Sequence, residues 1–434
     1  MENPESAASE RHAFLRELEW RGLLQDESEG FARRLTRGPI SGYVGFDPTS
    51  PSLQVGNLMP IAMLVALQRT GAGSPVAVVG GGTGMIGDPS GKSAERNLLD
   101  DDTLDANRAA IRSQLERFLD FDGKLGARLF DNRDWLAKYG LIEFLRDIGK
   151  HFPLSYMLAK DSVSTRMDKG ISYTEFSYMT LQATDFLHLY REHGVELQMG
   201  GADQWGNITA GTELIRRAEG LDEKGESCAF AVACPLLLTS TGAKFGKTAE
   251  GTVWLSADLT SPYEFYQYWI GQDDRDVAMM LRRLTLLEAD EIYELEEQQR
   301  STPEKRPAQR RLASVMTARV HGEDEARRQE KVAEALFAGQ PLRDPEVLDV
   351  LFGELDHFEF GDDELTLDAA ELAVAGGLFT SKSEARRMIQ QGGFSINDER
   401  VTAEDGARPD PIDGRYLVLR AGKKRTVIGR RREA

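Results

Sequence analysis

The sequence predicts an α/β protein built on a doubly wound parallel sheet, followed by two smaller regions. Between residues 38 and 255, short apolar strand patterns alternate with helical patterns, which is typical of a parallel sheet with helices on both faces. Residues 256–340 carry a charged helical pattern, and residues 365–434 combine one helix with short strands and Gly-rich turns. We therefore expect a Rossmann-like domain, then an α-helical domain, then a small α+β domain.

The elements of the first two regions follow from their apolar spacing. Residues 1–37 predict a helical lead-in, because Phe14, Leu15, Leu18, Leu23 and Leu24 recur at roughly helical spacing. The expected strands are 43–46, 75–80, 127–130, 194–200 and 229–235, of which the last closes the sheet. The helices expected between them are 58–67, 105–119, 174–193 and 207–219, and further helices fill 262–335. A segment at about 140–175 interrupts the alternation and is apolar for a loop region.

The composition bounds the class of protein. Hydrophobic residues make up 41% and charged residues 29%, which indicates a globular chain rather than a disordered one. No apolar run approaches the ~18 residues that span a bilayer, and the acidic N-terminus lacks the apolar core of a secretory signal. Two cysteines are too few for a disulfide framework and lack zinc-ligand partners at useful spacing. We expect a cytoplasmic protein with no membrane contact and no protein-ligated metal.

Charge is unevenly distributed along the chain. The net charge is −18, yet residues 415–434 carry eight basic side chains against one acidic one. A basic terminus on an acidic body suggests local contact with an anionic partner, of which RNA is one example. A solvated tail with no partner explains the same charges, and composition alone leaves both readings open.

The run at 41–49 indicates where a ligand binds. An apolar strand containing Tyr43 leads directly into Asp47, Pro48 and Thr49. In open α/β sheets ligands lie outside the carboxyl ends of the strands, so this turn faces a ligand. A phenol at the edge of a nucleotide-type site is unusual, and it makes Tyr43 a candidate binding residue.

Two Gly-rich motifs resemble nucleotide loops but fail on spacing. Gly82, Gly84 and Gly87 form a GxGxxG pattern, but the acid expected about twenty residues later falls in the start of a helix, so a dinucleotide site is not expected. The run 87–93, GlyAspProSerGlyLysSer, brings its first glycine one residue too close to GlyLysSer for a Walker loop.

The run 244–248, LysPheGlyLysThr, places two lysines three residues apart, which suits a charge-spread phosphoryl transition state.

Several long segments, in order, resemble the bacterial tyrosyl-tRNA synthetases, which are class I aminoacyl-tRNA synthetases. They are GlyPheAspProThr (45–49), GlyThrGlyMetIleGlyAspProSerGlyLys (82–92), PheSerTyrMetThrLeuGlnAlaThrAsp (176–185), GlnMetGlyGlyAlaAspGlnTrpGlyAsn (198–207) and LysPheGlyLysThr (244–248). The resemblance runs from about residue 30 to the C-terminus. It implies activation of L-tyrosine by ATP, with magnesium bound to the ATP, and transfer of tyrosine from the adenylate to tRNA(Tyr).

The residues of the helix 174–193 fit such a substrate. Tyr178, Gln182 and Asp185 fall at i, i+4 and i+7, which puts them on one helix face. A buried face with a phenol, an amide and a carboxylate needs polar partners, and a zwitterionic amino acid with a phenol tail supplies them. A hydrogen-bonded core network with no ligand is the alternative.

The resemblance also implies roles for individual residues. For tyrosine, it assigns the ammonium group to Asp88, Tyr178 and Gln182, the hydroxyl to Tyr43 and Asp185, and a further binding role to Gln198. For ATP and the adenylate, it implies that Gly201 and Asp203 contact the ribose and that Gln204 contacts the reacting carboxylate. It also implies that Gly45, Asp47 and Gly56 lie near the adenylate. For the pyrophosphate, it implies Thr49, Lys92, Arg96, Lys244, Lys247 and Thr248.

One signature departs from the family. Where the family usually has His-x-Gly-His, this chain has Gln54, Val55, Gly56 and Asn57. The amide nitrogens of Gln54 and Asn57 lie roughly where the histidine ring nitrogens would donate, so we expect catalytic contacts to phosphate that do not titrate near neutral pH. The missing histidines also support an alternative, a non-catalytic RNA-binding paralogue. A third reading is adenylation with another acceptor or a tryptophan-like substrate.

The remaining regions are expected to serve binding and assembly. By the resemblance, residues 256–340 bind the anticodon and residues 365–434 form a small RNA-binding domain of the ribosomal-protein S-four type, with a helix at 383–391 and strands near 394–396, 416–420 and 425–428. The residues expected to grip RNA are Lys382, Arg386, Arg387, Lys423, Lys424 and Arg425, although a solvated helix face would show the same pattern. The insertion at 140–175 is expected to form a homodimer.

Overall fold

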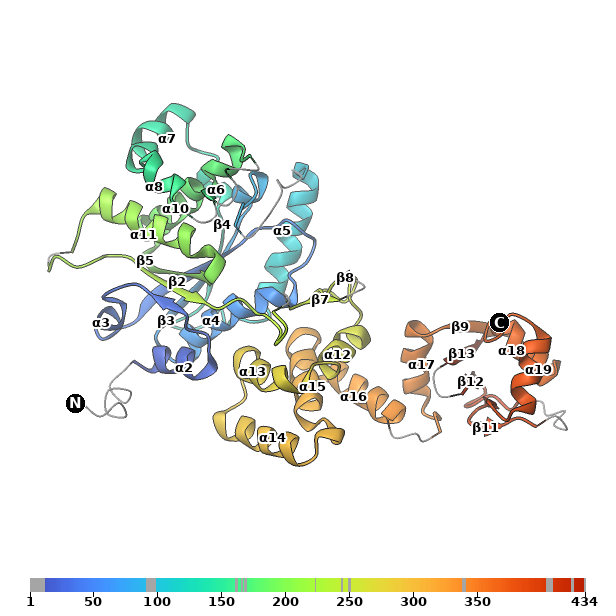
Figure 1. The fold of residues 1–434 in the computed structure, drawn as a ribbon. Coiled ribbons are helices and arrows are strands. Elements are labelled where there is room, and N and C mark those ends of the chain that lie inside the picture. The colour runs from blue at the N-terminus through green and yellow to red at the C-terminus, as the bar shows by residue number, and fades with distance from the viewer. Residues whose placement is uncertain are drawn as a thin grey trace. The chain divides into compact units, whose positions relative to one another are not determined.

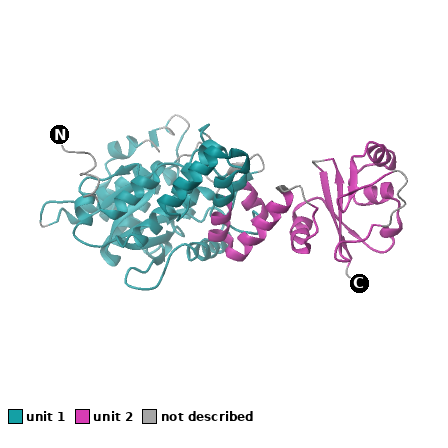
Figure 2. Cartoon of the chain, turned by 90° about the horizontal axis from the view of Figure 1, so that it is seen from below, with its two compact units in different colours: residues 1–261, 269–312 teal, residues 262–268, 313–434 magenta. Residues whose placement is uncertain are grey.

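The computed structural model describes residues 12–90, 99–160, 163–164, 167, 170–222, 224–242, 245–248, 251–337, 341–402, 409–422 and 425–432. The chain forms two compact units (Figure 2). Unit 1 comprises Met1–Ser261 and Trp269–Leu312, and unit 2 comprises Pro262–Tyr268 and Ala313–Ala434. Across the described part of the chain, no helix has the length and apolar character needed to cross a bilayer.

Unit 1 is built on a six-stranded sheet (Figure 1). Its order is β1-β6-β5-β2-β3-β4, with the strands β1 (Asp26–Glu27), β2 (Ile40–Phe46), β3 (Gly73–Val79), β4 (Arg128–Asp131), β5 (Val195–Gly201) and β6 (Phe230–Cys234). The five strands from β2 to β6 pair in parallel, which confirms the predicted fold class. The expectation that residues 229–235 close the sheet was wrong, because β1 pairs antiparallel outside β6. A strand of two residues is too short to leave a periodic signal.

Helices pack against both faces of this sheet. Successive side chains of a strand point to opposite faces. On β2, a side chain at Gly42 would meet Leu67 of α4 (Leu58–Arg69), whereas the neighbouring Tyr43 packs on Phe186 of α10 (Tyr173–His193) with ring centroids 5.3 Å apart. The other large helices are α5 (Asp101–Leu115) and α11 (Trp205–Glu219), which packs on α10. Helix α5 begins earlier than expected because the Asp100 carboxylate caps it, accepting the Thr103 N–H at 2.8 Å.

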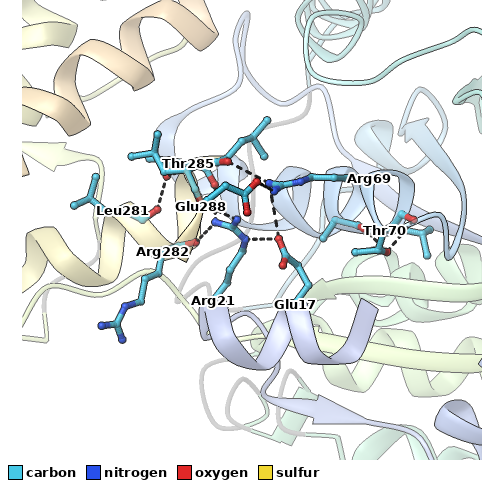
Figure 3. A network of polar contacts seen from close by, with 12 residues as sticks. Glu17, Arg21, Arg69, Thr70, Leu281, Arg282, Thr285 and Glu288 are labelled. Carbon is cyan, nitrogen blue, oxygen red and sulfur yellow. Dashed lines mark hydrogen bonds and ion pairs between the residues drawn. The ribbon is translucent and has the colours of Figure 1, made fainter. Parts of the chain in front are cut away.

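The lead-in helix is an integral part of unit 1 (Figure 3). In α2 (Ala13–Arg21), the Arg21 side chain is only 4% exposed. Its guanidinium donates to the carbonyls of Arg282, Thr285 and Leu287 at 2.9, 2.9 and 3.1 Å. These carbonyls lie at the end of α13 (Asp274–Leu284) and just beyond it, before α14 (Ala289–Ser301). One buried arginine therefore ties α2 to a segment of unit 1 that lies more than 260 residues further along the chain. The short helix α3 (Phe31–Leu35) follows β1.

Several short helices lie among the described residues between β4 and α10. They are α6 (Arg133–Leu136), α7 (Leu141–Asp147) and α8 (Leu154–Leu158). Leu141, Ile142 and Leu154 are 73%, 74% and 66% exposed, and Tyr173 at the start of α10 is 74% exposed. Large apolar side chains of this kind rarely gather on the free surface of a monomer.

Unit 2 includes a second, smaller sheet. Its helices include α16 (Glu323–Phe337), α17 (Pro345–Glu354) and the larger parts of α12 (Pro262–Ile270) and α15 (Pro307–His321), whose remaining residues belong to unit 1. The sheet has the order β11-β10-β12-β13-β9, with β9 (His357–Phe360), β10 (Phe394–Ile396), β11 (Glu399–Arg400), β12 (Tyr416–Ala421) and β13 (Arg425–Arg431). Helices α18 (Ala369–Ala375) and α19 (Lys382–Gln390) contribute to its core. Strand β9 was not expected, and its parallel pairing with β13 brings residues before 365 into this sheet.

Candidate functional site

A cavity of about 350 Å³ opens at the carboxyl ends of β2 and β5. This is the edge where the strand-end rule places a ligand. The residues that we expected at the site and that line this cavity are Tyr43, Gly45, Asp47, Thr49, Gln54, Gly56, Asn57, Asp88, Tyr178, Gln182, Asp185, Gln198, Gly201, Asp203 and Gln204. Lys92, Arg96 and Lys244 lie outside the described residues. The backbone of Lys247 and Thr248 forms β7 (Lys247–Thr248), which pairs with β8 (Gly251–Thr252).

A buried carboxylate forms the floor of the cavity. Asp185 of α10 is 3% exposed, and each of its oxygens accepts a hydrogen bond of 2.8 Å, one from Asn132 Nδ2 and one from Trp135 Nε1. Burial raises the pKa of Asp185 to about 8, while the two hydrogen bonds oppose that rise. Both donors are N–H groups that cannot accept a proton in return, so their arrangement matches the ionised carboxylate.

Two buried polar atoms in the cavity wall lack a hydrogen-bond partner within the described part of the chain. They are the hydroxyl of Tyr43 and Oε1 of Gln198. Burial, followed by the nearby Asp185, raises the pKa of Tyr43 well above its ordinary value, so the phenol stays neutral and can donate. An unsatisfied buried polar group costs ~1–3 kcal/mol, so a ligand with a matching hydroxyl would recover free energy here.

A second carboxylate, Asp47, is linked to the first by hydrogen bonds. Asp47 Oδ2 accepts from the Tyr178 hydroxyl at 2.8 Å, and Oδ1 accepts from Thr83 Oγ1 at 2.6 Å. Thr83 Oγ1 in turn accepts from Asn132 Nδ2 at 2.9 Å, and Asn132 also donates to Asp185. A continuous polar chain therefore runs along the cavity wall between the two acids. Burial and then Asp47 raise the pKa of Tyr178 well above its ordinary value.

A third carboxylate, Asp88, lies among amide side chains. Its Oδ2 accepts from Gln204 Nε2 at 2.6 Å, and its Oδ1 accepts from the backbone N–H of Ser90 at 2.9 Å. Asn207 Nδ2 joins this group through Gln204 Oε1 at 3.1 Å and Ser90 Oγ at 3.2 Å. Asp47, Asp88 and Asp185 thus give the cavity an acidic wall that suits a cationic group such as an ammonium.

Two amide side chains in the cavity lining, those of Gln54 and Asn57, offer donors. Gln54 and Asn57 flank the short turn that starts α4, and Asn57 Oδ1 accepts the Gln54 backbone N–H at 2.9 Å. This bond uses the oxygen of the Asn57 amide and leaves its Nδ2 hydrogens for another acceptor. The N-terminal end of α4 also carries a partial positive charge, because the first N–H groups of a helix have no partner within the helix. The combination suits phosphate oxygens.

Several residues of the site were missed from sequence. Asn132 and Trp135 hold Asp185, Thr83 joins Asn132 to Asp47, and Asn207 belongs to the Asp88 group. One signal was present: Asn132 directly follows β4, at the same edge of the sheet as Asp47. A buried tryptophan such as Trp135 also needs an acceptor for its N–H, which pointed to a polar partner.

Metal and RNA expectations concern other parts of the chain. Within the described ranges, no group of three or more His, Cys, Asp or Glu side chains could hold a metal ion.

On α19, Lys382 pairs with Glu371 at 2.7 Å and Arg386 pairs with Asp368 at 3.6 Å. Arg387 and Arg425 are exposed, and Lys423 and Lys424 lie outside the described residues. Two of the cations expected to grip RNA are therefore already engaged with carboxylates of their own unit.

Comparison with known proteins places the chain in a family. Residues 35–338 match the family described as tRNA synthetases class I (W and Y), and residues 348–428 match the tyrosine–tRNA ligase SYY-like C-terminal domain. The chain is similar to tyrosine–tRNA ligases of Anaeromyxobacter dehalogenans strain 2CP-1, at 50% identity over 96% of this chain and 98% of the relative, and of Bacillus caldotenax, at 46% identity over 96% and 99%. A C-terminally truncated mitochondrial tyrosyl-tRNA synthetase of Coccidioides posadasii superposes with a TM-score of 0.66 at 31% identity, over 75% of this chain and 93% of that one. The chain therefore belongs to the family of class I tRNA synthetases for tryptophan and tyrosine.

Proposed function

We propose that this protein is a tyrosine–tRNA ligase. It activates L-tyrosine with ATP to tyrosyl-adenylate and pyrophosphate, then transfers tyrosine to the 3′ end of tRNA(Tyr). The observation that carries the proposal is the pair at the cavity floor: the unpartnered hydroxyl of Tyr43 beside the carboxylate of Asp185. Together they offer one donor and one acceptor in a dry site, which is what a phenolic hydroxyl needs.

The same pair argues against other aromatic amino acids. A tyrosine hydroxyl donates to Asp185 and accepts from Tyr43, so both buried groups are satisfied. An indole N–H donates but cannot accept, which leaves the Tyr43 hydroxyl unpaired. Phenylalanine satisfies neither group, and each unpaired buried polar group costs free energy.

The rest of the amino acid fits the acidic wall. In this proposal the ammonium group binds Asp88, Tyr178 and Gln182, and Gln198 adds a further polar contact. Gln204 orients the substrate carboxylate, and its amide is held for this role by Asp88 at 2.6 Å. The reacting carboxylate then points along the cavity toward the donors at the start of α4.

The chemistry that follows needs positioning rather than a general base. An oxygen of the tyrosine carboxylate, which is already a nucleophile, bonds to the α-phosphorus of ATP, and the bond from that phosphorus to pyrophosphate breaks. Gln54, Asn57 and Thr49 donate to the phosphates, together with Lys92, Arg96, Lys244, Lys247 and Thr248. Magnesium arrives with the ATP. Gly201 and Asp203 hold the ribose, and Gly45, Asp47 and Gly56 lie beside the adenylate.

Assembly and partners complete the proposal. The exposed apolar side chains of Leu141, Ile142, Leu154 and Tyr173 support a two-fold dimer through the 140–175 region. The helical region 256–340 is assigned to the anticodon arm and residues 365–434 to tRNA binding. We place the protein in the cytoplasm, where its tRNA substrate is.

The adenylation half is tested by exchange of labelled pyrophosphate into ATP without tRNA. Tyrosine should support exchange, and phenylalanine and tryptophan should not. Tyr43→Phe should lower kcat/KM for tyrosine, while Tyr416→Phe, which removes a buried phenol from unit 2, should leave it unchanged. Tyrosine binding without exchange would favour the non-catalytic RNA-binding paralogue, and exchange with tryptophan alone would overturn the assignment of substrate.

The transfer half is tested by truncation. Removing residues 341–434 takes away all strands of the second sheet and α17, which packs against β13. We expect pyrophosphate exchange to survive and charging of tRNA(Tyr) to be lost. Charging that persists at the full rate would refute the RNA-binding role of the C-terminal region.

A further inference from the structure

One buried carboxylate of unit 1 has no part in the chemistry above. Asp276 lies in the first turn of α13 and is 5% exposed. Its Oδ1 accepts the backbone N–H of Ser240 at 2.9 Å, and its Oδ2 accepts the Ser240 hydroxyl at 3.3 Å. Both oxygens of a buried acid are thus directed at one residue of a loop.

Ser240 belongs to the segment that leads into LysPheGlyLysThr. The backbone N–H of Phe245 donates to the Leu237 carbonyl at 3.1 Å and closes this segment, while the side chains of Leu237 and Phe245 are 7% exposed. Within it, Gly242 donates to Thr239 at 2.8 Å in a tight turn. Asp276 therefore holds the root of the loop that carries the two lysines of the phosphate site.

The far side of the same loop is held next to the Gln54–Asn57 turn. The Val253 N–H donates to the Gly246 carbonyl at 2.8 Å, and the Val253 carbonyl accepts the Val55 N–H at 3.2 Å. A side chain at Gly246, whose φ is +77°, would meet Val55 Cβ at 3.3 Å. Val253, directly after β8, thus connects the two sequence signatures proposed to bind phosphate.

Helix α13 is a rigid support for this anchor. The three carbonyls that Arg21 binds are Arg282 near its C-terminal end and Thr285 and Leu287 just beyond it. The helix also packs against α4, whose N-cap is Asn57 and which follows the turn that Gln54 begins. Asp276 sits at the other end of α13, so it fixes Ser240 relative to the helix that starts at the phosphate site.

We propose that Asp276 is a positioning residue for adenylate formation: by holding Ser240 it fixes the root of the lysine-bearing loop. This inference rests on the proposed function. The loop's cations stabilise charge that develops as the α-phosphorus is attacked, so misplacing them lowers the rate of the step. Neither Asp276 nor Ser240 is among the residues that line the cavity, so we expect tyrosine binding not to depend on the anchor.

The test separates this role from ordinary stability. Asp276→Ala should lower kcat for tyrosine-dependent pyrophosphate exchange by about tenfold or more, with the tyrosine Kd changed less than about twofold. Asp276→Asn keeps an acceptor for the Ser240 N–H and should restore part of the rate. Ser240→Ala removes only the hydroxyl bond and should give a smaller loss than Asp276→Ala.

A matched control lies in the same helical turn. Asp274 accepts from the amides of Gln299 and Gln309 at 3.1 and 2.5 Å and has no bond to the described residues of the loop, so Asp274→Ala disturbs α13 without touching Ser240. Its kcat should stay near that of the wild type. Equal losses in the Asp274 and Asp276 variants, or a wild-type kcat in Asp276→Ala, would overturn the anchor alone. A wild-type chain without exchange would overturn the proposed function and this role with it.

Discussion

Removing one hydrogen bond from Asp185 should weaken the recognition of the tyrosine hydroxyl. In Trp135→Phe the indole N–H that donates to Asp185 at 2.8 Å is lost, while an aromatic ring remains to stack on His188, whose ring centroid lies 4.5 Å away at 18°. A hydrogen bond to a charged group contributes ~1.5–3 kcal/mol. Since one pKa unit corresponds to about 1.36 kcal/mol, the loss of this hydrogen bond should raise the pKa of Asp185 by roughly one to two units.

The direction of the pH dependence follows from that carboxyl. With a pKa of about 8, Asp185 must lose its proton to accept the tyrosine hydroxyl, so wild-type kcat/KM for tyrosine should rise with pH and level off above pH 8. Because the substitution raises the pKa of Asp185 further, a smaller fraction of this carboxyl is ionised at neutral pH in the variant than in the wild type. We therefore expect a loss of about tenfold or more at this pH, and a rise displaced to higher pH.

Pyrophosphate exchange between pH 6 and 9, with tyrosine and with high concentrations of phenylalanine, measures this effect. Phenylalanine has no hydroxyl, so any residual exchange it supports should be insensitive to the substitution. An unshifted profile for tyrosine would refute the reasoning. A loss shared equally by both amino acids would show instead that Trp135 acts through packing.

Substitutions at three other positions test separate parts of the proposal. Gln54→His should add a second ionisation near pH 6.5 to the pH profile of exchange, beyond the one that Asp185 gives the wild type. Gln54→Ala should lower the rate while the tyrosine Kd stays the same. Ile142→Asp, at a side chain 74% exposed, should give a monomer in sedimentation velocity, with the free energy of unfolding of the isolated subunit changed by less than about 0.5 kcal/mol. Gly80→Ala places a methyl group onto Asp47 Oδ1 and Thr83 Oγ1, and should reduce exchange at least about tenfold.

These three have distinct contradicting results. A pH profile in Gln54→His identical to that of the wild type would mean that position 54 makes no phosphate contact. A dimer that survives Ile142→Asp would place the subunit interface elsewhere, and full activity in Gly80→Ala would show that the link between Thr83 and Asp47 is dispensable.

Local sequence patterns were sufficient for the sheet and for one helix face of the site. The alternation of strands and helices predicted a parallel sheet, and β2 to β6 pair in that way. The spacing of Tyr178, Gln182 and Asp185 predicted one face of α10, and all three side chains line the cavity. Both predictions rest on the 2.0 and 3.6 residue periods, which are properties of the local backbone.

Elements whose sequences show no periodic pattern could not be predicted in this way. Strand β1 has two residues and β9 has four, and each is defined by the strand it joins rather than by its own pattern. The cations Lys382 and Arg386 formed a basic stripe in the sequence, yet their pairing with Glu371 and Asp368 depends on a neighbouring helix. Charge along a chain does not reveal which charges are already compensated.

The sequence by itself determined the fold class and the side chains facing the ligand edge, because strand ends and helix faces are set by local geometry. The tertiary structure alone decided how those side chains are held. Asn132 joins Asp185 to Thr83 across 53 and 49 residues, and Asp276 reaches Ser240 across 36. Such bonds depend on which segments the core brings together, and the local periodicity of the sequence contains no information about that.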